Sequence, residues 1–497
     1  MQSLSPNRDQ IETSSNFFRY TSGRWLLDEQ KQLERRYVQF DIAALQQTAE
    51  QICGSQCVQM TKLPEGLFNK VFSLRMENGK EVLARIPNPN AGDPRSVVAS
   101  EVATLDFLRT VLDIPVPKVM GSSSRLQQNP VGAEYILMGR VKGRQLSNVW
   151  DTMSEAQRFG LVKSIVEIER RLASTTFAGY GSLYHKGAIP SSNSMTALVE
   201  MDQGATPEFV LGPTTERSFW EDEKRELEID RGPWKNAQEY LTAVANREIA
   251  LILKQFVLVL PYILPAKDLV GPVLLHHDLH SENIFVDDTD PTKLSSIIDW
   301  QSLYSSPLFI QARFPSVFDS DDEPYPWGAV QPQLPTDFHA LSRSNQKLAE
   351  AQLNRLRLKK FYELATRKFN PLLARAMDFI RRDNDPTTFL FHIVGQSSID
   401  GPIPLQELLV QVFESWDLIT EQHGNPCPIS FSREEIDRVR QQAEAWSEAY
   451  AEFDNLRTQT LGHEGWVSHD DYEEAMRRWR DSRAELEALR KRLEEFL

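Results

Sequence analysis

The stretch His276-His277-Asp278-Leu279-His280-Ser281-Glu282-Asn283, followed by Ile297-Ile298-Asp299-Trp300, decides how the fold of this 497-residue chain is interpreted. The apolar run Ile284-Phe285-Val286 predicts a short β-strand, and the residues before Asp299 predict a return strand after an Asp- and Pro-containing turn. In such a hairpin Asn283 opens the first strand and Asp299 closes the second. Antiparallel pairing would therefore bring these two side chains together.

The side chains of Asp278, Asn283 and Asp299 suit phosphoryl transfer from a nucleotide. One carboxylate can receive or orient the proton of an acceptor hydroxyl, while a carboxamide oxygen and a second carboxylate hold Mg²⁺ on the phosphates. Mg²⁺ prefers hard oxygen ligands and keeps several waters, so it needs few protein groups.

Two other interpretations of the same residues remain open. The histidines at 276, 277 and 280 could join Asp278 and Asp299 in holding two metals for hydrolysis, but that leaves Asn283 and the hairpin spacing unexplained. The second interpretation is an acidic surface turn with a purely structural role. It does not explain why an aspartate ends the apolar run at 297–298, because a carboxylate buried there is costly unless it is paired or metal-bound.

The pattern His-x-Asp-x-x-x-x-Asn followed by Ile-Asp-Trp resembles the catalytic loop and metal-binding aspartate of the aminoglycoside phosphotransferase and choline kinase-like family, relatives of the protein kinases. The resemblance implies ATP and Mg²⁺ as cofactors and a two-lobed, protein-kinase-like α+β fold. It also implies that Asp278 is the catalytic base, that His276 braces the loop backbone, and that Asn283 and Asp299 are the Mg²⁺ ligands.

A nucleotide-binding lobe is predicted upstream of this motif. The runs at 71–74 and 82–86 flank Glu77-Asn78-Gly79-Lys80, and an Asn-Gly pair between two such runs is a strong hairpin signal. The preceding segment 64–70 would be the loop whose backbone N–H groups cover the phosphates. Its single glycine, Gly66, makes an ordinary surface turn an equal alternative.

Arg85 stands at the end of the third predicted strand, where the family resemblance places a phosphate-contacting lysine. A guanidinium stays charged and binds phosphate oxygens in a two-pronged way, so the role survives the substitution. Asp93-Pro94 predicts the start of a helix, and Glu101 lies on its inward stripe. By analogy with the kinase ion pair, Arg85 is the expected partner of Glu101. The alternative is that Glu101 is a solvated residue at the margin of the apolar stripe.

The segment from Glu134 to Gly143 resembles the strand and hinge that join the two lobes of such kinases. Backbone groups near Gly139 and Val141 are the candidates for contact with the adenine.

Composition and charge narrow the range of partners. The net charge of −15 argues against nonspecific nucleic-acid binding, and would favour a cationic acceptor without specifying one. The acidic run at 319–323 could attract such an acceptor, or be a solvated loop.

Three cysteines (Cys53, Cys57 and Cys427) provide no disulfide framework and indicate a reducing compartment. No run reaches the length of a membrane span, and the N-terminus shows neither signal peptide nor mitochondrial presequence.

Beyond the catalytic core, the chain resembles the fungal altered inheritance of mitochondria protein 9 group. The resemblance rests on Phe17 to Trp25, on Gly212-Pro213-Thr214 with Phe219-Trp220, and on Asp230 to Trp234. It implies a mitochondrial location, with the cytoplasm as the alternative, and leaves the substrate undefined.

These observations predict four regions. Residues 1–60 form an extension packed on the core, 61–140 the nucleotide-binding lobe, 141–430 the catalytic and substrate-binding lobe, and 431–497 a helical hairpin that caps the core or makes an oligomer contact. The predicted reaction transfers the ATP γ-phosphate to a hydroxyl of a small molecule. The alternative is a nucleotide-binding pseudokinase that acts as an interaction protein, favoured by Arg85 and the sparse glycine loop.

Overall fold

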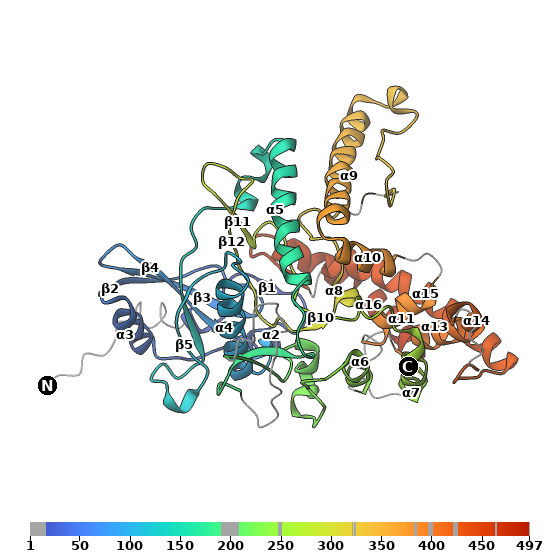
Figure 1. Ribbon diagram of the computed structural model, residues 1–497, viewed down its shortest axis with the longest axis horizontal. Coiled ribbons are helices and arrows are strands. Elements are labelled where there is room, and N and C mark those ends of the chain that lie inside the picture. The colour runs from blue at the N-terminus through green and yellow to red at the C-terminus, as the bar shows by residue number, and fades with distance from the viewer. Residues whose placement is uncertain are drawn as a thin grey trace.

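The chain folds into a small lobe built on an antiparallel sheet and a larger lobe that is mainly helical (Figure 1). The predicted α+β class and two-lobed, kinase-like architecture are confirmed. The segment on which the expectation about targeting rests, at the very N-terminus, lies outside the described residues. This computed structural model describes residues 16–189, 208–246, 251–320, 322, 325–381, 385–395, 401–420, 426–462 and 465–496.

The sheet of the small lobe has five antiparallel strands in the order β2-β3-β4-β6-β5. Their bounds are β2 (Cys57–Lys62), β3 (Asn69–Met76), β4 (Glu81–Pro87), β5 (Val119–Ser123) and β6 (Tyr135–Gly139). Helix α3 (Ile42–Cys53) covers one part of this sheet, next to β2 and β3, and α4 (Pro94–Thr110) packs against β4, β5 and β6.

The β3–β4 hairpin turns at the predicted Asn-Gly pair. Gly79 has a φ of 80°, a conformation that glycine adopts without a steric cost, and Lys80 N donates to Asn78 Oδ1 over 3.0 Å. The register pairs Phe72 with Ala84, both fully buried, and continues to Val71 opposite Arg85. The turn chemistry therefore fixes where Arg85 lies in the sheet.

Helix α4 begins as predicted at Asp93-Pro94. The Asp93 carboxylate caps the helix by accepting from Ser96 N over 3.0 Å. Proline at the first helical position loses no hydrogen bond there, because that N–H has no partner within the helix. Because the cap fixes the residue at which the helix begins, it also fixes which face of the helix carries Glu101, and that face is buried.

The predicted catalytic hairpin is present as β11 (Ile284–Val286) and β12 (Leu294–Ile297), with Ile284 paired to Ile297. The Asp287 carboxylate closes the turn by accepting from the backbone of Thr289 and Asp290. A third short strand, β7 (Arg144–Gln145), extends the sheet from the segment that follows the hinge. The return strand ends before Asp299, which does not belong to it.

The larger lobe consists mainly of helices. None of the helices within the described residues is long and apolar enough to cross a membrane. Their bounds are α5 (Glu155–Ala173), α6 (Ala237–Asn246), α7 (Leu251–Ile263), α8 (Leu308–Gln311), α9 (Arg343–Phe369), α10 (Pro371–Ile380), α11 (Pro386–Ile393), α13 (Ile403–Glu414) and α14 (Trp416–Ile419). Two strand pairs join β8 (Ser182–His185) to β9 (Phe209–Gly212) and β10 (Pro272–Val273) to β13 (Ser306–Pro307).

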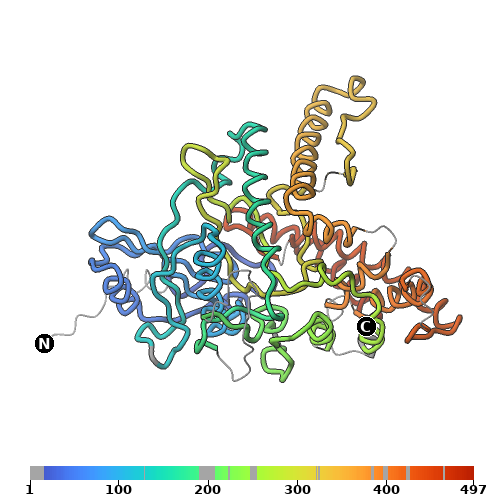
Figure 2. Tube along the Cα trace, viewed as in Figure 1, coloured from blue at the N-terminus to red at the C-terminus, as the bar shows by residue number. Residues whose placement is uncertain are grey.

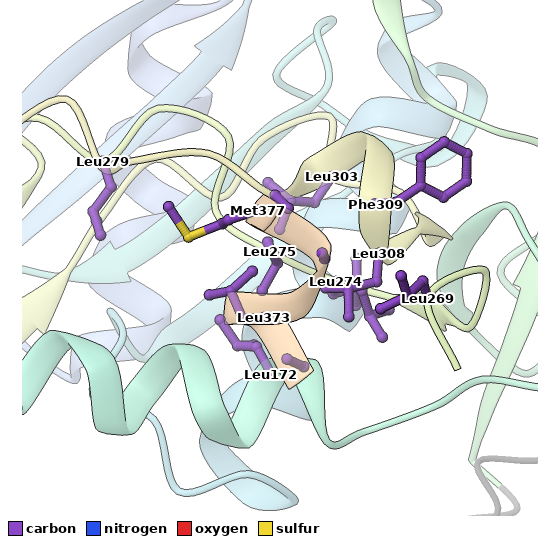
Figure 3. Close-up of a cluster of buried hydrophobic side chains, with 14 of the residues drawn as sticks. Leu172, Leu269, Leu274, Leu275, Leu279, Leu303, Leu308, Phe309, Leu373 and Met377 are labelled. Carbon is purple, nitrogen blue, oxygen red and sulfur yellow. The ribbon is translucent and has the colours of Figure 1, made fainter. Parts of the chain in front are cut away.

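A buried apolar cluster lies under the start of the catalytic loop (Figure 3). Leu274 and Leu275 are 2% and 5% exposed, and they lie near Leu373 of α10 and Leu308 of α8. Side chains of this size contribute about 1.5–3 kcal/mol each when fully buried. Because the apolar residues immediately precede His276, the core holds the loop backbone in place.

The two ends of the described chain meet in a short antiparallel pair. Strand β1 (Arg24–Trp25), just before α2 (Glu29–Glu34), pairs with β14 (Trp466–Val467), which lies between α15 (Arg433–Leu461) and α16 (Tyr472–Glu494). Figure 2 shows the red C-terminal helices reaching back towards the blue N-terminal part. We call this β1–β14 pair the terminal clasp. Trp466 Nε1 donates to the Tyr20 hydroxyl over 3.0 Å, and the Arg24 guanidinium lies 3.5 Å from the centre of the Tyr472 ring.

We expect Gly23→Ala to weaken the terminal clasp. A Cβ built at Gly23 lies 2.5 Å from the Trp466 indole, closer than van der Waals contact permits. Such overpacking costs about 1–3 kcal/mol of the free energy of unfolding, measurable by urea denaturation. Gly66→Ala is the matched control, because its Cβ meets nothing within 4 Å. Equal stability of Gly23→Ala and the wild type would mean that the clasp does not bear on stability.

Candidate active site

The catalytic loop is held by three hydrogen bonds that involve two of its own side chains, His276 and Asn283. His276 Nε2 lies 2.9 Å from the Ile298 carbonyl, and His276 Nδ1 accepts from Asp278 N over 3.2 Å. Asn283 Nδ2 donates to the Asp278 carbonyl over 2.9 Å. His276 thus ties the loop to the return strand of the hairpin, which is the bracing position that the family resemblance implied.

Asp278 projects from this loop with 65% of its side chain exposed, and its Oδ2 lies 3.5 Å from His280 Nε2. The hydrogen bond from His280 lowers the pKa of Asp278, while burial opposes the shift. The same contact raises the pKa of His280. The Asp278 carboxylate is therefore kept ionised and accessible, as a group that takes up or orients a proton must be.

Asn283 and Asp299 are neighbours across the open end of the hairpin. Ile298 N donates to the Asn283 carbonyl over 3.0 Å, which places Asp299 next to Asn283. Within the described residues no donor reaches Asn283 Oδ1, although the side chain is only 6% exposed. Asp299 has a φ of 64°, in the left-handed region that few non-glycine residues adopt, and its side chain is 47% exposed. One carboxamide and one carboxylate oxygen donor fit a hard cation such as Mg²⁺.

The histidines do not gather into a second metal site. His276 contacts a backbone carbonyl, and His277 Nδ1 lies 3.2 Å from Arg313 Nη2, a cation that competes with metal binding. In the part of the chain that the structure describes, no three His, Cys, Asp or Glu side chains form a group that could hold a metal ion. The contacts thus give no support to the two-metal hydrolase interpretation.

Arg85 links the two lobes through a buried ionic network. Its Nη1 pairs with Glu101, as expected, and its Nη2 bonds to Asp299 Oδ1 over 2.8 Å and to Gln301 Oε1 over 2.5 Å. Burial raises the pKa of Glu101 to about 7, and the charge of Arg85 opposes this shift. The alternative of a solvated Glu101 is wrong, since the side chain is 3% exposed.

The loop with Gly66 is anchored by its buried neighbour Glu65. Glu65 Oε1 accepts from Lys70 Nζ over 3.0 Å, and its Oε2 accepts from Thr21 N over 3.2 Å. Burial lowers the pKa of Lys70 to about 8. Among the described residues, the backbone N–H groups of 66–68 donate to no acceptor. These three donors are therefore available to phosphate oxygens, as a phosphate-covering loop requires.

The predicted hinge follows β6 directly. Gly139 N donates to the Lys118 carbonyl over 2.9 Å, and Gly139 ends the strand, while Val141 lies two residues beyond it. Ser295 Oγ donates to the Lys142 carbonyl over 2.7 Å, just before the backbone enters β7. Both residues lie on the connection between the lobes, and their contact with adenine stays a prediction.

Two glutamines were missed by sequence reasoning. Gln301 receives hydrogen bonds from Arg85 and Asn69, so it joins the turn that contains Asp299 to β3 and β4. Gln311 is buried, accepts from Leu275 N over 2.9 Å and donates to the Val273 carbonyl over 2.7 Å, which fastens α8 to the segment before the catalytic loop. A polar residue inside the apolar run 307–312 was the signal that could have revealed Gln311.

A cavity of about 1020 Å³ opens in front of Asp278 and Asp299. Its walls include Arg35 and Arg36, just after α2, Arg217 after β9, and Arg457 and Leu461 of α15. The C-terminal hairpin, for which no catalytic role is predicted, therefore supplies part of the cavity wall.

The acidic run at 319–323, expected to attract a cation, is engaged elsewhere. Asp319 pairs with Lys359 and Asp322 with Arg355, while Asp321 and Glu323 lie outside the described residues.

The fold and this set of side chains define the class of kinase-like phosphotransferases of small substrates. Residues 59–309 match the model of the phosphotransferase enzyme family, and the chain belongs to that family. A subtelomeric hrmA-associated cluster protein of Aspergillus fumigatus is 31% identical over 491 aligned positions, which cover 86% of this chain and 93% of that protein.

Other relatives confirm the resemblance to the fungal group. Altered inheritance of mitochondria protein 9 of Saccharomyces cerevisiae is 22% identical, over 93% of this chain and 87% of that protein. Among solved structures, the ADP-bound aminoglycoside phosphotransferase APH(2'')-Ib is 14% identical with a TM-score of 0.35, covering 75% of this chain and 97% of that one.

Proposed function

We propose that this protein transfers the γ-phosphate of ATP to a hydroxyl of a small molecule, with Mg²⁺ as the metal. The observation that carries the proposal is the local geometry of Asp278, Asn283 and Asp299. Asn283 bonds through its amide nitrogen to the backbone of Asp278, and pairs through its own backbone beside Asp299. Asp278 and Asp299 thus line one cavity, and Asn283 lies between them at the start of the hairpin.

In this proposal each residue has a distinct task. Asp278 accepts or orients the proton of the acceptor hydroxyl, and His280 keeps it ionised. Asn283 Oδ1 and the Asp299 carboxylate hold Mg²⁺, which when bound neutralises charge on the phosphates. Arg85, positioned by Glu101, contributes its positive charge to binding the phosphates. The N–H groups of 66–68 cover them, and the backbone near Gly139 and Val141 meets the adenine.

The proposal is tested by measuring ADP formation and phosphorylated product, by mass spectrometry, across a panel of hydroxyl compounds. Product formation that requires both ATP and Mg²⁺ would support it. ATP binding with no turnover of any acceptor would favour the second candidate, a nucleotide-binding pseudokinase that acts as an interaction protein. The direct bond between Arg85 and Asp299 favours that candidate, because the same carboxylate is needed for the metal.

Replacing His280 by asparagine should move the acidic limb of the pH–rate profile to higher pH. His280 is the largest cause of the lowered pKa of Asp278, with smaller contributions from the charges of His276 and Arg313. Without the hydrogen bond, Asp278 becomes protonated at a higher pH, so kcat/KM falls earlier as the solution is acidified. The measurement is kcat/KM from neutral pH down to below 3.8, the ordinary pKa of an aspartate. An unmoved acidic limb would show that this contact does not tune the group that limits the rate at low pH.

For location, we propose the mitochondrion, with the cytoplasm as the alternative. The support is the name of the altered inheritance of mitochondria protein 9 relatives, which are described as mitochondrial. Microscopy of the chain with a C-terminal fluorescent fusion distinguishes the two.

A further inference from the structure

In the part of the chain that the structure describes, two arginines of the cavity wall have no acidic partner. Arg217 lies over the ring of Phe68, 3.8 Å from its centre, and Arg313 contacts the imidazole of His277. Within the described residues no carboxylate lies at ion-pair distance from either guanidinium, in contrast to Arg457 of the same wall, which pairs with Asp454. Two cations of one cavity therefore keep their full capacity for an anion.

Both arginines are held in place by buried groups. Thr215, two residues before Arg217, is buried, and its N–H donates to Ser182 Oγ over 2.9 Å. Ser182 Oγ in turn donates to the Leu303 carbonyl over 3.0 Å, which ties this segment to the turn after Asp299. Arg313 follows Gln311, whose buried amide is bonded to the chain before the catalytic loop. Neither arginine belongs to an unanchored surface loop.

His277 connects the arginine pair to the catalytic loop. Its ring stacks on Tyr304 with centroids 5.2 Å apart, and it precedes Asp278 directly in sequence. Burial lowers the pKa of His277 to about 3, and the charges of Arg313 and Arg217 contribute to the shift. His277 is therefore neutral at physiological pH, and the positive charge beside Asp278 comes from the guanidinium groups.

Within the described residues, the acidic groups of the cavity form no ion pair with these two arginines. Asp278 and Asp299 belong to the proposed catalytic set, and Glu216 accepts from the hydroxyls of Ser218 and Tyr240. Asp28 and Glu221 also line the cavity, but neither pairs with Arg217 or Arg313. The lining holds as many carboxylates as arginines, so an anion would find its partners in these two unpaired guanidinium groups and not in a net positive charge.

We propose that the acceptor is an anionic hydroxyl compound whose phosphate or carboxylate group binds to Arg217 and Arg313, with its hydroxyl at Asp278. This inference rests on the proposed phosphotransferase function and names its substrate class. Guanidinium groups bind phosphate and carboxylate through paired N–H donors. Two guanidinium groups near one catalytic carboxylate would therefore select a compound that carries both an anionic group and a hydroxyl. The γ-phosphate of ATP has the same chemistry, so the experiment separates the two sources.

The first experiment is a calorimetric titration with inorganic phosphate of the full chain saturated with Mg²⁺ and a non-hydrolysable ATP analogue. We expect phosphate to bind, and Arg217→Gln and Arg313→Gln each to weaken it about 10- to 100-fold, since one charge-assisted contact is lost. Arg483→Gln is the matched control, because Arg483 is an exposed arginine of α16 paired with Glu487. Absence of phosphate binding, or equal binding by all variants, would overturn the inference.

The same variants identify the source of the anion. We expect the affinity for the ATP analogue to change less than twofold, and a tenfold loss would assign the arginines to the nucleotide instead. Acceptors are then compared in pairs, such as glycerol with glycerol 3-phosphate. A lower KM for the anionic member, lost in Arg313→Gln, supports the inference, whereas preferred turnover of neutral or cationic members overturns it. Absence of all turnover would count against the proposed function, and the phosphate titration would still decide the anion site.

Discussion

Asp278→Asn should abolish turnover while leaving nucleotide affinity almost unchanged. The substitution keeps the shape of the side chain but removes the charge that receives or orients the hydroxyl proton, a contribution worth about 10²–10⁴-fold in rate. Because Asp278 is 65% exposed, the change should cost little stability. Single-turnover measurements of γ-phosphate transfer report the rate, and fluorescence titration with an ATP analogue reports affinity.

A matched substitution makes this experiment specific. Asp287→Asn changes a half-buried aspartate in the turn of the same hairpin, whose role is to accept hydrogen bonds from the turn backbone. It should leave the rate within about threefold, because no reacting group is touched. Undiminished turnover of Asp278→Asn would remove the proposed role of this residue, whatever the control does.

Arg85→Met should have the second largest effect, on both stability and nucleotide binding. It leaves the Glu101 carboxylate, 3% exposed, without its cation. Breaking a buried ion pair from one side costs about 3–5 kcal/mol, because the remaining charge stays desolvated. The affinity for ATP should fall at least tenfold, as the phosphates lose a charge-assisted contact. Urea denaturation and nucleotide titration measure the two losses.

The stability loss in Arg85→Met should depend on pH. In the wild type the pKa of Glu101 is raised to about 7 from an ordinary value of 4.5, so this group favours the folded state in its protonated form. Its contribution to the free energy of unfolding therefore declines as pH rises through this window. Removing Arg85 raises that pKa further, so the loss should be larger at pH 8 than at pH 6. The double variant Arg85→Met, Glu101→Gln should recover much of the stability at pH 8, and no recovery would mean that the buried charge is not the cause.

Local chemistry explains which parts of the fold could be predicted from the sequence. The Asn78-Gly79 turn, the Asp93 cap and the apolar runs beside Asn283 each act over a few residues, so their patterns are visible in the chain itself. The Arg85–Glu101 pair followed from the helix stripe and the family resemblance together.

Contacts between distant segments could not be predicted in this way. The terminal clasp consists of two strands of two residues each, which carry no periodic pattern. Arg217 and Arg313 look like ordinary surface residues, because an arginine in a sequence does not reveal which face of the molecule it joins. The φ of 64° at Asp299 also has no signal, because aspartate adopts both right- and left-handed conformations and its presence in a sequence does not show which one.

The meeting of Trp25 with Trp466 has a consequence for how the protein is made. Tyr20 and Trp466, which share a hydrogen bond, are 446 positions apart, and α15 next to this contact contributes Arg457 and Leu461 to the cavity. A ribosome must therefore translate beyond residue 461 before the cavity has all its walls. A nascent chain halted after the turn that contains Asp299 would possess every proposed catalytic group yet lack the cavity in which they are proposed to work.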